Sequence, residues 1–236
     1  MKRPAVVLDF YGTVARATSS TGIDEILARH GHSIPEHLAA TWWSGDIDGM
    51  EHVEQSGSRE RYVAWQQERL VAMLHEADIH PGEHDAILSD LHDERALRVL
   101  EAYDEVPDVL RELRLRGVTV AICSNWDWDL EPAIAEAGLA GCFDTVVSSA
   151  WAGARKPHAR IYQYLLERSG LDPADIVFVG DTWGPDVEGP RAAGMTPAYL
   201  ERVGHWPDDT LPPEAADDEV TRLRDLWGVL PLVGAD

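Results

Sequence analysis

The sequence predicts an α/β protein with a doubly wound parallel sheet and an inserted helical domain. The first observation is a set of short apolar, β-branched runs at residues 6–8, 118–123 and 176–179, each followed by polar or turn residues. Such runs are typical of strands that are buried on both faces of a parallel sheet. The second is a regular strand–helix alternation after residue 103, which requires crossover helices. The third is helical patterning, with few β-branched runs, over residues 15–102.

The α/β core is expected to comprise residues 1–14 and 103–236. Pro107 suits the first turn of a helix, and glycines at 117, 138 and 170 are placed to end helices. The Pro- and Asp-rich segment 206–218 predicts a surface loop. The expected elements in chain order are strand 6–8, helix 107–116, strand 118–123, helix 130–137, strand 145–148, helix 159–169, strand 176–179, helix 187–193, strand 197–200 and a closing helix 220–227.

The insert, residues 15–102, is expected to be all-helical. Apolar residues recur at helical spacing in the segments 24–30, 61–74 and 85–100. A helix whose apolar residues share one face buries that face against another helix. The insert is therefore predicted to form a domain of its own beside the sheet.

Composition limits the partners and the compartment. The formal charge is −22, from 42 acidic and 20 basic residues, which argues against a nucleic acid or an anionic membrane as partner. The residues before the first strand form no secretory signal, and no apolar run reaches the ~18 residues of a membrane span. Cys123 and Cys142 are expected as small core residues of a cytoplasmic protein.

Polar residues with chemical potential stand where the predicted strands end. Because the carboxyl ends of parallel strands meet at one edge, where such sheets bind ligands, we expect these side chains to lie together. Each residue also has a structural interpretation, as a helix cap, a turn former or a surface charge. They are Asp9, Ser124, Asn125, Lys156, Asp181 and Asp186.

The order of these segments resembles the haloacid dehalogenase (HAD) superfamily of hydrolases. Its four motifs match Asp9 to Thr13, Ser124-Asn125, Lys156-Pro157, and Gly180-Asp181 through Asp186, and the resemblance extends from Val6 to about Gly194. It implies a HAD-like, Rossmann-like core. It also implies that the helical insert, residues 15–102, is a cap domain that closes over the site and selects the substrate.

The resemblance also implies metal chemistry at the first and fourth motifs. Asp9 would be the nucleophile and would form an aspartyl-phosphate intermediate that water releases. Asp9, Asp181 and Asp186 would supply oxygen ligands for Mg²⁺, together with the backbone carbonyl of Tyr11. Hard oxygen ligands of this kind suit an octahedral ion that keeps some of its waters.

The second and third motifs are expected to hold the substrate. Ser124, the amide of Asn125 and Lys156 would bind the transferring oxygens while charge shifts onto them. Lys156 is also expected to be a catalytic residue. The side chain of Tyr11 is expected to contact the substrate. The expected substrate is a small phosphorylated metabolite, and Mg²⁺ is the expected cofactor.

Tyr11 departs from the pattern of the phosphatases, which carry a general acid/base Asp at this position. The Asp-x-Tyr-Gly-Thr form resembles the metal-free 2-haloacid dehalogenases, whereas Asp181 favours a metal-dependent phosphatase. A third interpretation is a binding or regulatory protein with the HAD fold and little turnover. A phenol is a poor general base near neutrality, so the acid is expected from elsewhere. Candidates in the insert are His30, His32, His37, Glu51 and His52.

Overall fold

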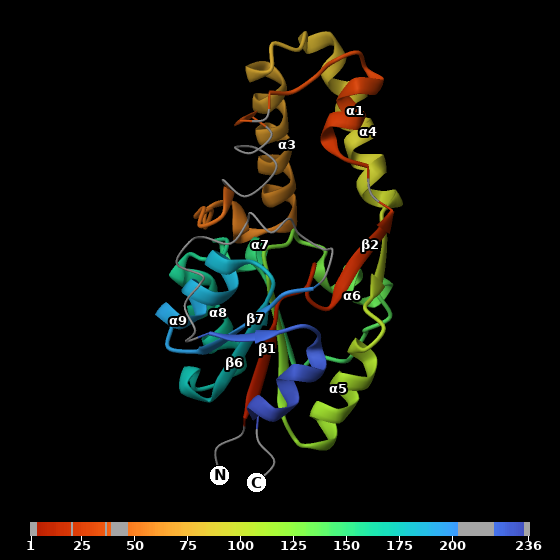
Figure 1. The fold of residues 1–236 in the computed structure, drawn as a ribbon. Coiled ribbons are helices and arrows are strands. Elements are labelled where there is room, and N and C mark those ends of the chain that lie inside the picture. Colours follow the sequence, from red (N-terminus) through yellow and green to blue (C-terminus); the bar gives the residue numbers. More distant parts are fainter. Residues whose placement is uncertain (1–3, 20, 36, 39–46, 203–219, 234–236) are drawn as a thin grey trace.

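The computed structural model describes residues 4–233 except 20, 36, 39–46 and 203–219. A parallel sheet covered by helices forms one part of the molecule, and the insert stands above the end of the sheet toward which β1 points (Figure 1). Among the described residues, no helix combines the length and the apolar character that crossing a membrane requires.

In the described part of the chain, the main sheet has six strands in the order β5-β4-β1-β6-β7-β8, and every neighbouring pair is parallel. Its centre is the pairing of Leu8 with Ile122 on one side and with Val179 on the other. The strands are β1 (Ala5–Leu8), β4 (Thr119–Ser124), β5 (Thr145–Ser148), β6 (Ile176–Gly180), β7 (Thr196–Leu200) and β8 (Thr221–Leu223).

Alternate residues of β1 enter two different hydrophobic cores. Val6 and Leu8 pack in the core that includes residues of α5 (Val106–Leu115) and α6 (Leu130–Glu136). Ala5 and Val7 pack in the core that includes residues of α8 (Ala159–Ser169). Because successive side chains of a strand point to opposite faces, the sheet is covered on both sides. The predicted doubly wound α/β fold is therefore confirmed.

The insert leaves and rejoins the core through an antiparallel pair, β2 (Ala15–Ser19) and β3 (Val99–Ala102). Beyond this pair its helices enclose a separate hydrophobic cluster that includes Leu27, Met73 and Ile87. The helical segments among the described residues of the insert are α1 (Ile23–Arg29), the 3₁₀ turn η2 (Gln55–Gly57), α3 (Arg59–Glu76), the 3₁₀ turn η3 (Pro81–Glu83) and α4 (His84–Leu97).

Two predicted boundaries within the insert and the core need correction. The helix expected over 85–100 ends at Leu97, because residues 99–102 pair with β2 instead. The helix expected near 187–193 is a π-helical turn, η5 (Gly184–Glu188), followed by the short α9 (Gly189–Ala192). A short helix α7 (Ser149–Ala152) follows β5 directly.

The closing helix expected over 220–227 is wrong. Residues 221–223 form β8, which extends the sheet beside β7, and a 3₁₀ helix η8 (Leu226–Val233) follows. Edge pairing satisfies the backbone of this segment, and Leu223 and Leu226 complete the core on the α5 side. The loop expected over 206–218 lies outside the described residues.

Candidate active site

Two strand ends deliver the first two carboxylates of the site. Asp9 directly follows β1, and its backbone N–H donates to the carbonyl of Val179 at 2.9 Å. Asp181 directly follows β6 and accepts a hydrogen bond from Thr13 Oγ1 at 3.2 Å. Both side chains are buried. The structure brings the three predicted acids together: each of Asp9, Asp181 and Asp186 offers a carboxylate oxygen that lies within 4.8 Å of those of the other two.

Asp186 reaches this cluster because the chain turns tightly after β6. Its N–H donates to Thr182 O at 2.9 Å, just before the π-helical turn, and its own Oδ2 accepts from Thr182 N at 3.0 Å. Gly180 makes room for it: a Cβ there would lie 2.2 Å from Asp186 Cγ. The spacing of the fourth motif therefore reflects both a glycine beside the acid and a tight turn behind it.

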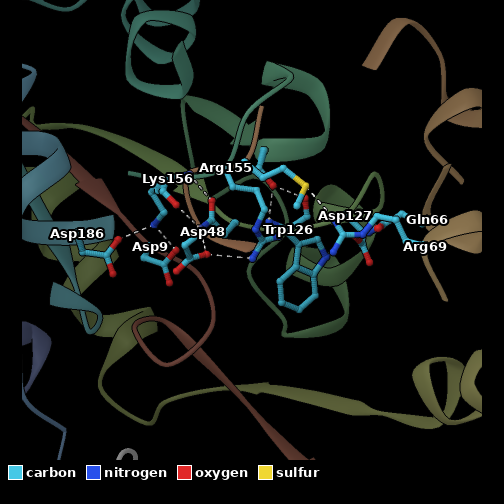
Figure 2. A network of polar contacts seen from close by, with 12 residues as sticks. Asp9, Asp48, Gln66, Arg69, Trp126, Asp127, Arg155, Lys156 and Asp186 are labelled. Atoms are coloured by element: carbon cyan, nitrogen blue, oxygen red, sulfur yellow. Dashed lines mark hydrogen bonds and ion pairs between the residues drawn. The ribbon is translucent and has the colours of Figure 1, made fainter. Parts of the chain in front are cut away.

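Lys156 lies between two of the carboxylates (Figure 2). Its Nζ donates to Asp9 Oδ1 at 2.7 Å and to Asp186 Oδ1 at 2.5 Å, with only 2% of the residue exposed. Burial alone lowers the pKa of Lys156, but the charges of Asp186 and Asp9 outweigh it and hold the pKa well above its ordinary value. Burial raises the pKa of Asp186 to about 6, against the opposing charge of Lys156.

The donor set fits a divalent cation. Three buried carboxylates lie close together there, and the Lys156 ammonium contacts two of them. A bound cation would reduce the repulsion between such closely spaced negative charges. Three carboxylates supply hard oxygen donors, the kind that Mg²⁺ takes.

The second motif lies on the other side of β1, at the end of β4. Ser124 is buried there and is paired in register with Ser148 of β5. The side chain of Asn125 is engaged with protein groups: Nδ2 donates to Asp48 Oδ1 and to Lys156 O, both at 2.9 Å, and Oδ1 accepts from Lys156 N at 2.6 Å. Direct binding of substrate by Ser124 and Asn125 stays a prediction.

Comparison with known proteins gives the family. The sequence-family model of the haloacid dehalogenase-like hydrolases matches residues 4–194. The chain belongs to the haloacid dehalogenase-like hydrolases. The (S)-2-haloacid dehalogenase of Pseudomonas sp. strain YL is 30% identical over 222 residues, which cover 93% of this chain and 90% of that protein.

Other members of the family are similar over shorter segments. The human haloacid dehalogenase-like hydrolase domain-containing protein 3 is 41% identical over 95 residues, 40% of this chain and 38% of that protein. The phosphoserine phosphatase of Thermus thermophilus is 35% identical over 135 residues, 56% of this chain and 53% of that protein. The matched segments thus span about two fifths and about half of these two relatives.

Solved structures of the family share the fold. A predicted phosphoglycolate phosphatase from Haemophilus somnus superposes with a TM-score of 0.67 at 18% identity, and the match covers 99% of both chains. At this identity the likeness concerns the fold alone. The chain is therefore a HAD-like hydrolase, and the relatives include both phosphatases and dehalogenases.

Tyr11, the residue that departs from the phosphatase pattern, lies against an aromatic wall. Its ring centroid is 6.3 Å from that of Trp126, and Phe10 meets the same indole edge-on at 5.0 Å. Trp126 itself follows the Ser124-Asn125 motif and is buried. Tyr11 is half-buried at this wall, and both its substrate contact and its carbonyl contact to a metal stay predictions.

The structure places three of the insert's candidate acids in other contacts. His30 Nε2 lies 2.8 Å from Asp90, and His32 Nε2 lies 3.3 Å from Glu83, within the helical insert. His52 is 3% exposed, and burial lowers its pKa to about 4. Glu51 is exposed, as is His37. None of these observations assigns the acid of this HAD-like hydrolase.

Sequence reasoning missed two residues beside the site, Asp48 and Arg155. Asp48 Oδ1 accepts from Asn125 Nδ2. The same oxygen lies 3.4 Å from Arg155 Nη2 (Figure 2). Asp48 stands 77 positions before Asn125 in the chain, in a segment without a motif. Arg155 is directly next to Lys156, and that adjacency was the available signal.

Proposed function

We propose that this chain is a Mg²⁺-dependent phosphatase of a small phosphorylated metabolite. The observation that carries the proposal is the cluster of three carboxylates, whose oxygens lie within 4.8 Å of one another. Asp181 and Asp186 are the two acids expected in metal-dependent members of the superfamily. The metal-free dehalogenase branch typically has Ser at the first of these positions, which leaves little to hold a cation.

Asp9 is the proposed nucleophile. One of its carboxylate oxygens bonds to phosphorus while the bond from phosphorus to the leaving oxygen breaks, which gives an aspartyl-phosphate and an alkoxide that takes up a proton to become the alcohol. Water then attacks this phosphorus, releases inorganic phosphate and restores Asp9. Mg²⁺, held by Asp9, Asp181 and Asp186, would supply positive charge that offsets the repulsion between the carboxylate and the phosphate.

Lys156 acts in this scheme as a fixed positive charge. Its ammonium lies 2.7 Å from the Asp9 oxygen, and the raised pKa keeps it protonated. A protonated amine cannot serve as a base, so Lys156 stabilises the charge that develops on the transferring oxygens. The Ser124 hydroxyl, at the neighbouring strand end, is the proposed neutral partner of those oxygens.

Residues 15–102 are the proposed cap domain, and residues 1–14 with 103–236 the proposed catalytic core. The separate hydrophobic cluster of the insert and its attachment through β2 and β3 support this division. Substrate choice is assigned to the insert because it stands above the end of the sheet that carries the acids (Figure 1). Caps of this kind exclude water while the reaction proceeds.

The test is hydrolysis of 4-nitrophenyl phosphate with Mg²⁺ and with EDTA, by the wild type and by Asp9→Asn. The amide keeps the shape of the side chain and removes its nucleophilic charge. We expect hydrolysis that requires Mg²⁺ and falls to background in Asp9→Asn. Activity that is indifferent to EDTA, or that survives in Asp9→Asn, would contradict the proposal.

A metal-free 2-haloacid dehalogenase is the second candidate. Tyr11 and the 30% identity to a 2-haloacid dehalogenase over 93% of this chain favour it. The same preparations are therefore assayed for chloride release from (S)-2-chloropropanoate. Chloride release in EDTA, without phosphate release from any ester, would establish this alternative, and the absence of both reactions would favour a binding or regulatory protein.

A further inference from the structure

Asp48 is an acid of the insert that the proposed mechanism does not use. Its side chain is 25% exposed. Its Oδ1 accepts a hydrogen bond from Asn125 Nδ2 at 2.9 Å and lies 3.4 Å from Arg155 Nη2. Burial raises the pKa of Asp48, while the charges of Arg155 and Lys156 oppose the rise. Asp48 is thus a carboxylate of the insert that contacts the core beside the acid–lysine cluster.

Asn125 carries this contact onward to the backbone of Lys156. Its Oδ1 accepts from Lys156 N at 2.6 Å, and its Nδ2 donates to Lys156 O at 2.9 Å. A side-chain amide has two N–H donors, and here one goes to Lys156 and the other to Asp48. A carboxylate can only accept, so Asp48 fixes which end of the amide faces it and thereby orients both bonds to Lys156.

The backbone that directly follows Asp48 holds the same loop. Gly49 N donates to Lys156 O at 3.0 Å, Arg155 N donates to Met50 O at 2.9 Å, and His52 N donates to Gly153 O at 2.7 Å. The segment from residue 49 to 52 therefore runs along the loop that ends at Lys156. The Lys156 ammonium reaches Asp9 and Asp186 at the end of a flexible side chain. The position of the ammonium therefore depends on where the loop holds the Lys156 backbone.

We propose that Asp48 is a positioning residue, which aligns Lys156 with Asp9 through Asn125 and so couples docking of the insert to assembly of the catalytic site. The catalytic consequence rests on the proposed function, whereas the positioning of the loop does not. The contact between Asp48 and Asn125 acts together with the backbone bonds of residues 49–52 to hold Lys156 in line with Asp9. The insert thereby contributes to the chemistry as well as to substrate choice.

The first measurement is independent of any reaction. Hydrogen–deuterium exchange of peptides that cover residues 153–156 is compared between the wild type and Asp48→Ala. Loss of the carboxylate releases the Asn125 amide, so exchange at the Lys156 N–H is expected to accelerate about fivefold or more. Asp48→Asn keeps an oxygen acceptor for Asn125 and should exchange like the wild type.

The second measurement is hydrolysis of 4-nitrophenyl phosphate with Mg²⁺. In Asp48→Ala we expect kcat to fall about 10- to 100-fold with a smaller change in KM, because a misplaced Lys156 stabilises the transition state poorly. Asp48→Asn should stay within about threefold of the wild type, since the acceptor is kept. The double variant with Asn125→Ala should be no slower than Asn125→Ala alone, because both changes cut one chain of contacts.

Asp93→Ala is the matched control, since Asp93 is an exposed acid of α4 in the same insert. It should change neither exchange nor kcat, and circular dichroism checks that each variant is folded. Unchanged exchange at residues 153–156 in folded Asp48→Ala would overturn the proposal. Faster exchange with an unchanged kcat would overturn the catalytic role.

Failure of the proposed function gives a different result. If the wild type hydrolyses no phosphate ester, the phosphatase assignment falls, while the exchange experiment still decides whether Asp48 holds the loop. The same kcat comparison is then made on chloride release from (S)-2-chloropropanoate, because Lys156 faces Asp9 whichever substrate that carboxylate attacks.

Discussion

Gly180 shows how a single residue determines the geometry of the acid cluster. The position is followed directly by Asp181, while Asp186 returns to it through the π-helical turn. Any side chain at residue 180 would occupy the space of the Asp186 carboxyl group, as the 2.2 Å approach to Cγ shows. Glycine is needed here for space, since the backbone angle of this residue is ordinary.

Gly180→Ala is expected to displace Asp186 and to weaken Mg²⁺ binding at least tenfold. The structure must shift to make room for the new Cβ, and this shift should lower the free energy of unfolding by about 1–3 kcal/mol, the usual cost of overpacking. Calorimetric titration with Mg²⁺ and chemical denaturation measure the two effects. Gly184→Ala is the control, because its Cβ would lie 3.8 Å from the nearest atom, Glu188 Oε2. Equal Mg²⁺ affinity in both variants would contradict this account of Gly180.

Tyr11→Asp is expected to raise the turnover of alkyl phosphates and to change that of aryl phosphates much less. A carboxyl group at this position can protonate an alkoxide as it leaves, while an aryloxide leaves without that help. The gain should fall within the ~10²- to 10⁴-fold range of general acid catalysis, less any cost of losing the ring contact with Trp126.

The measurement is the ratio of kcat/KM for an alkyl and an aryl phosphate, with thermal denaturation alongside it. Tyr11→Asn serves as the control, since it removes the ring without adding an acid. An unchanged ratio in a folded, Mg²⁺-binding Tyr11→Asp would mean that another group already protonates the leaving oxygen.

Two residues of the acid cluster were predictable because each directly follows a strand, and Asp186 was predictable from its place five positions after Asp181 in the fourth motif. Asp9 and Asp181 follow buried apolar runs, and parallel strands bring their ends together whatever the intervening chain does. Asp48 was not predictable, since its partners lie in the core and nothing local marks it. The orientation of Asn125 toward the Lys156 backbone was equally hidden, because a motif gives residue types without giving their contacts.

At the scale of elements, the helices α1, α3 and α4 act as one packed unit. Their shared cluster includes Ile26, Met73 and Leu74, all fully or nearly fully buried. The helical period of the apolar residues predicted these elements well, since burial of one face is what produces that period. α3 also bonds the core, because Asp127 accepts from Tyr62 Oη at 3.0 Å and from Gln66 Nε2 at 2.9 Å.

Leu74→Ala is expected to lower the free energy of unfolding of the insert by about 2–5 kcal/mol, because a fully buried side chain leaves a cavity. Leu115→Ala on α5 is the matched control, since Leu115 is 76% exposed and should cost little. Urea denaturation followed by circular dichroism compares the two. Similar losses for both variants would mean that the insert's cluster does not contribute as its burial implies.

Two of the elements that were predicted wrongly depend on pairing with a distant segment. Residues 221–223 are a strand because β7 offers a free edge, and residues 99–102 are a strand because β2 lies opposite. Local patterning over 220–227 and 85–100 is compatible with a helix, and tertiary pairing outweighs it. The core strands β1, β4 and β6 were predicted correctly, because burial on both faces gives a continuous run of apolar residues in the sequence.

At the scale of the whole molecule, the junction between the insert and the core contains a buried neutral histidine. His52 Nδ1 lies 3.1 Å from Ser56 Oγ, and its ring stacks at a tilt against Trp65 at 4.9 Å. Burial is the main cause of its low pKa, and the charges of Arg155 and Arg69 lower it further. The folded protein therefore favours the uncharged form of this ring.

Stability should accordingly fall on the acid side. Above pH ~6.5 His52 is neutral in both states, whereas between pH 6.5 and about 4 the unfolded chain binds a proton that the folded chain does not. The free energy of unfolding should therefore decrease as the pH falls through this window, by up to about 3 kcal/mol from His52.

The check is the unfolding free energy at several pH values for the wild type and for His52→Gln, which does not titrate. The unfolding free energy of the wild type should fall relative to that of His52→Gln as the pH goes from 6.5 to 4, because only the wild type loses stability through protonation of this residue. Parallel curves over that window would show that His52 does not stay neutral in the folded protein.

The antiparallel pair β2–β3 implies that the insert can be exchanged for another sequence. Ser19 lies opposite Val99, so the polypeptide departs from and returns to nearly the same point of the core. A tight turn joining these two residues would make a hairpin and leave all four motifs in place. The insert is in this sense an exchangeable module: another sequence with ends equally close could be grafted there. Such a graft would have to bring its own counterpart of Asp48.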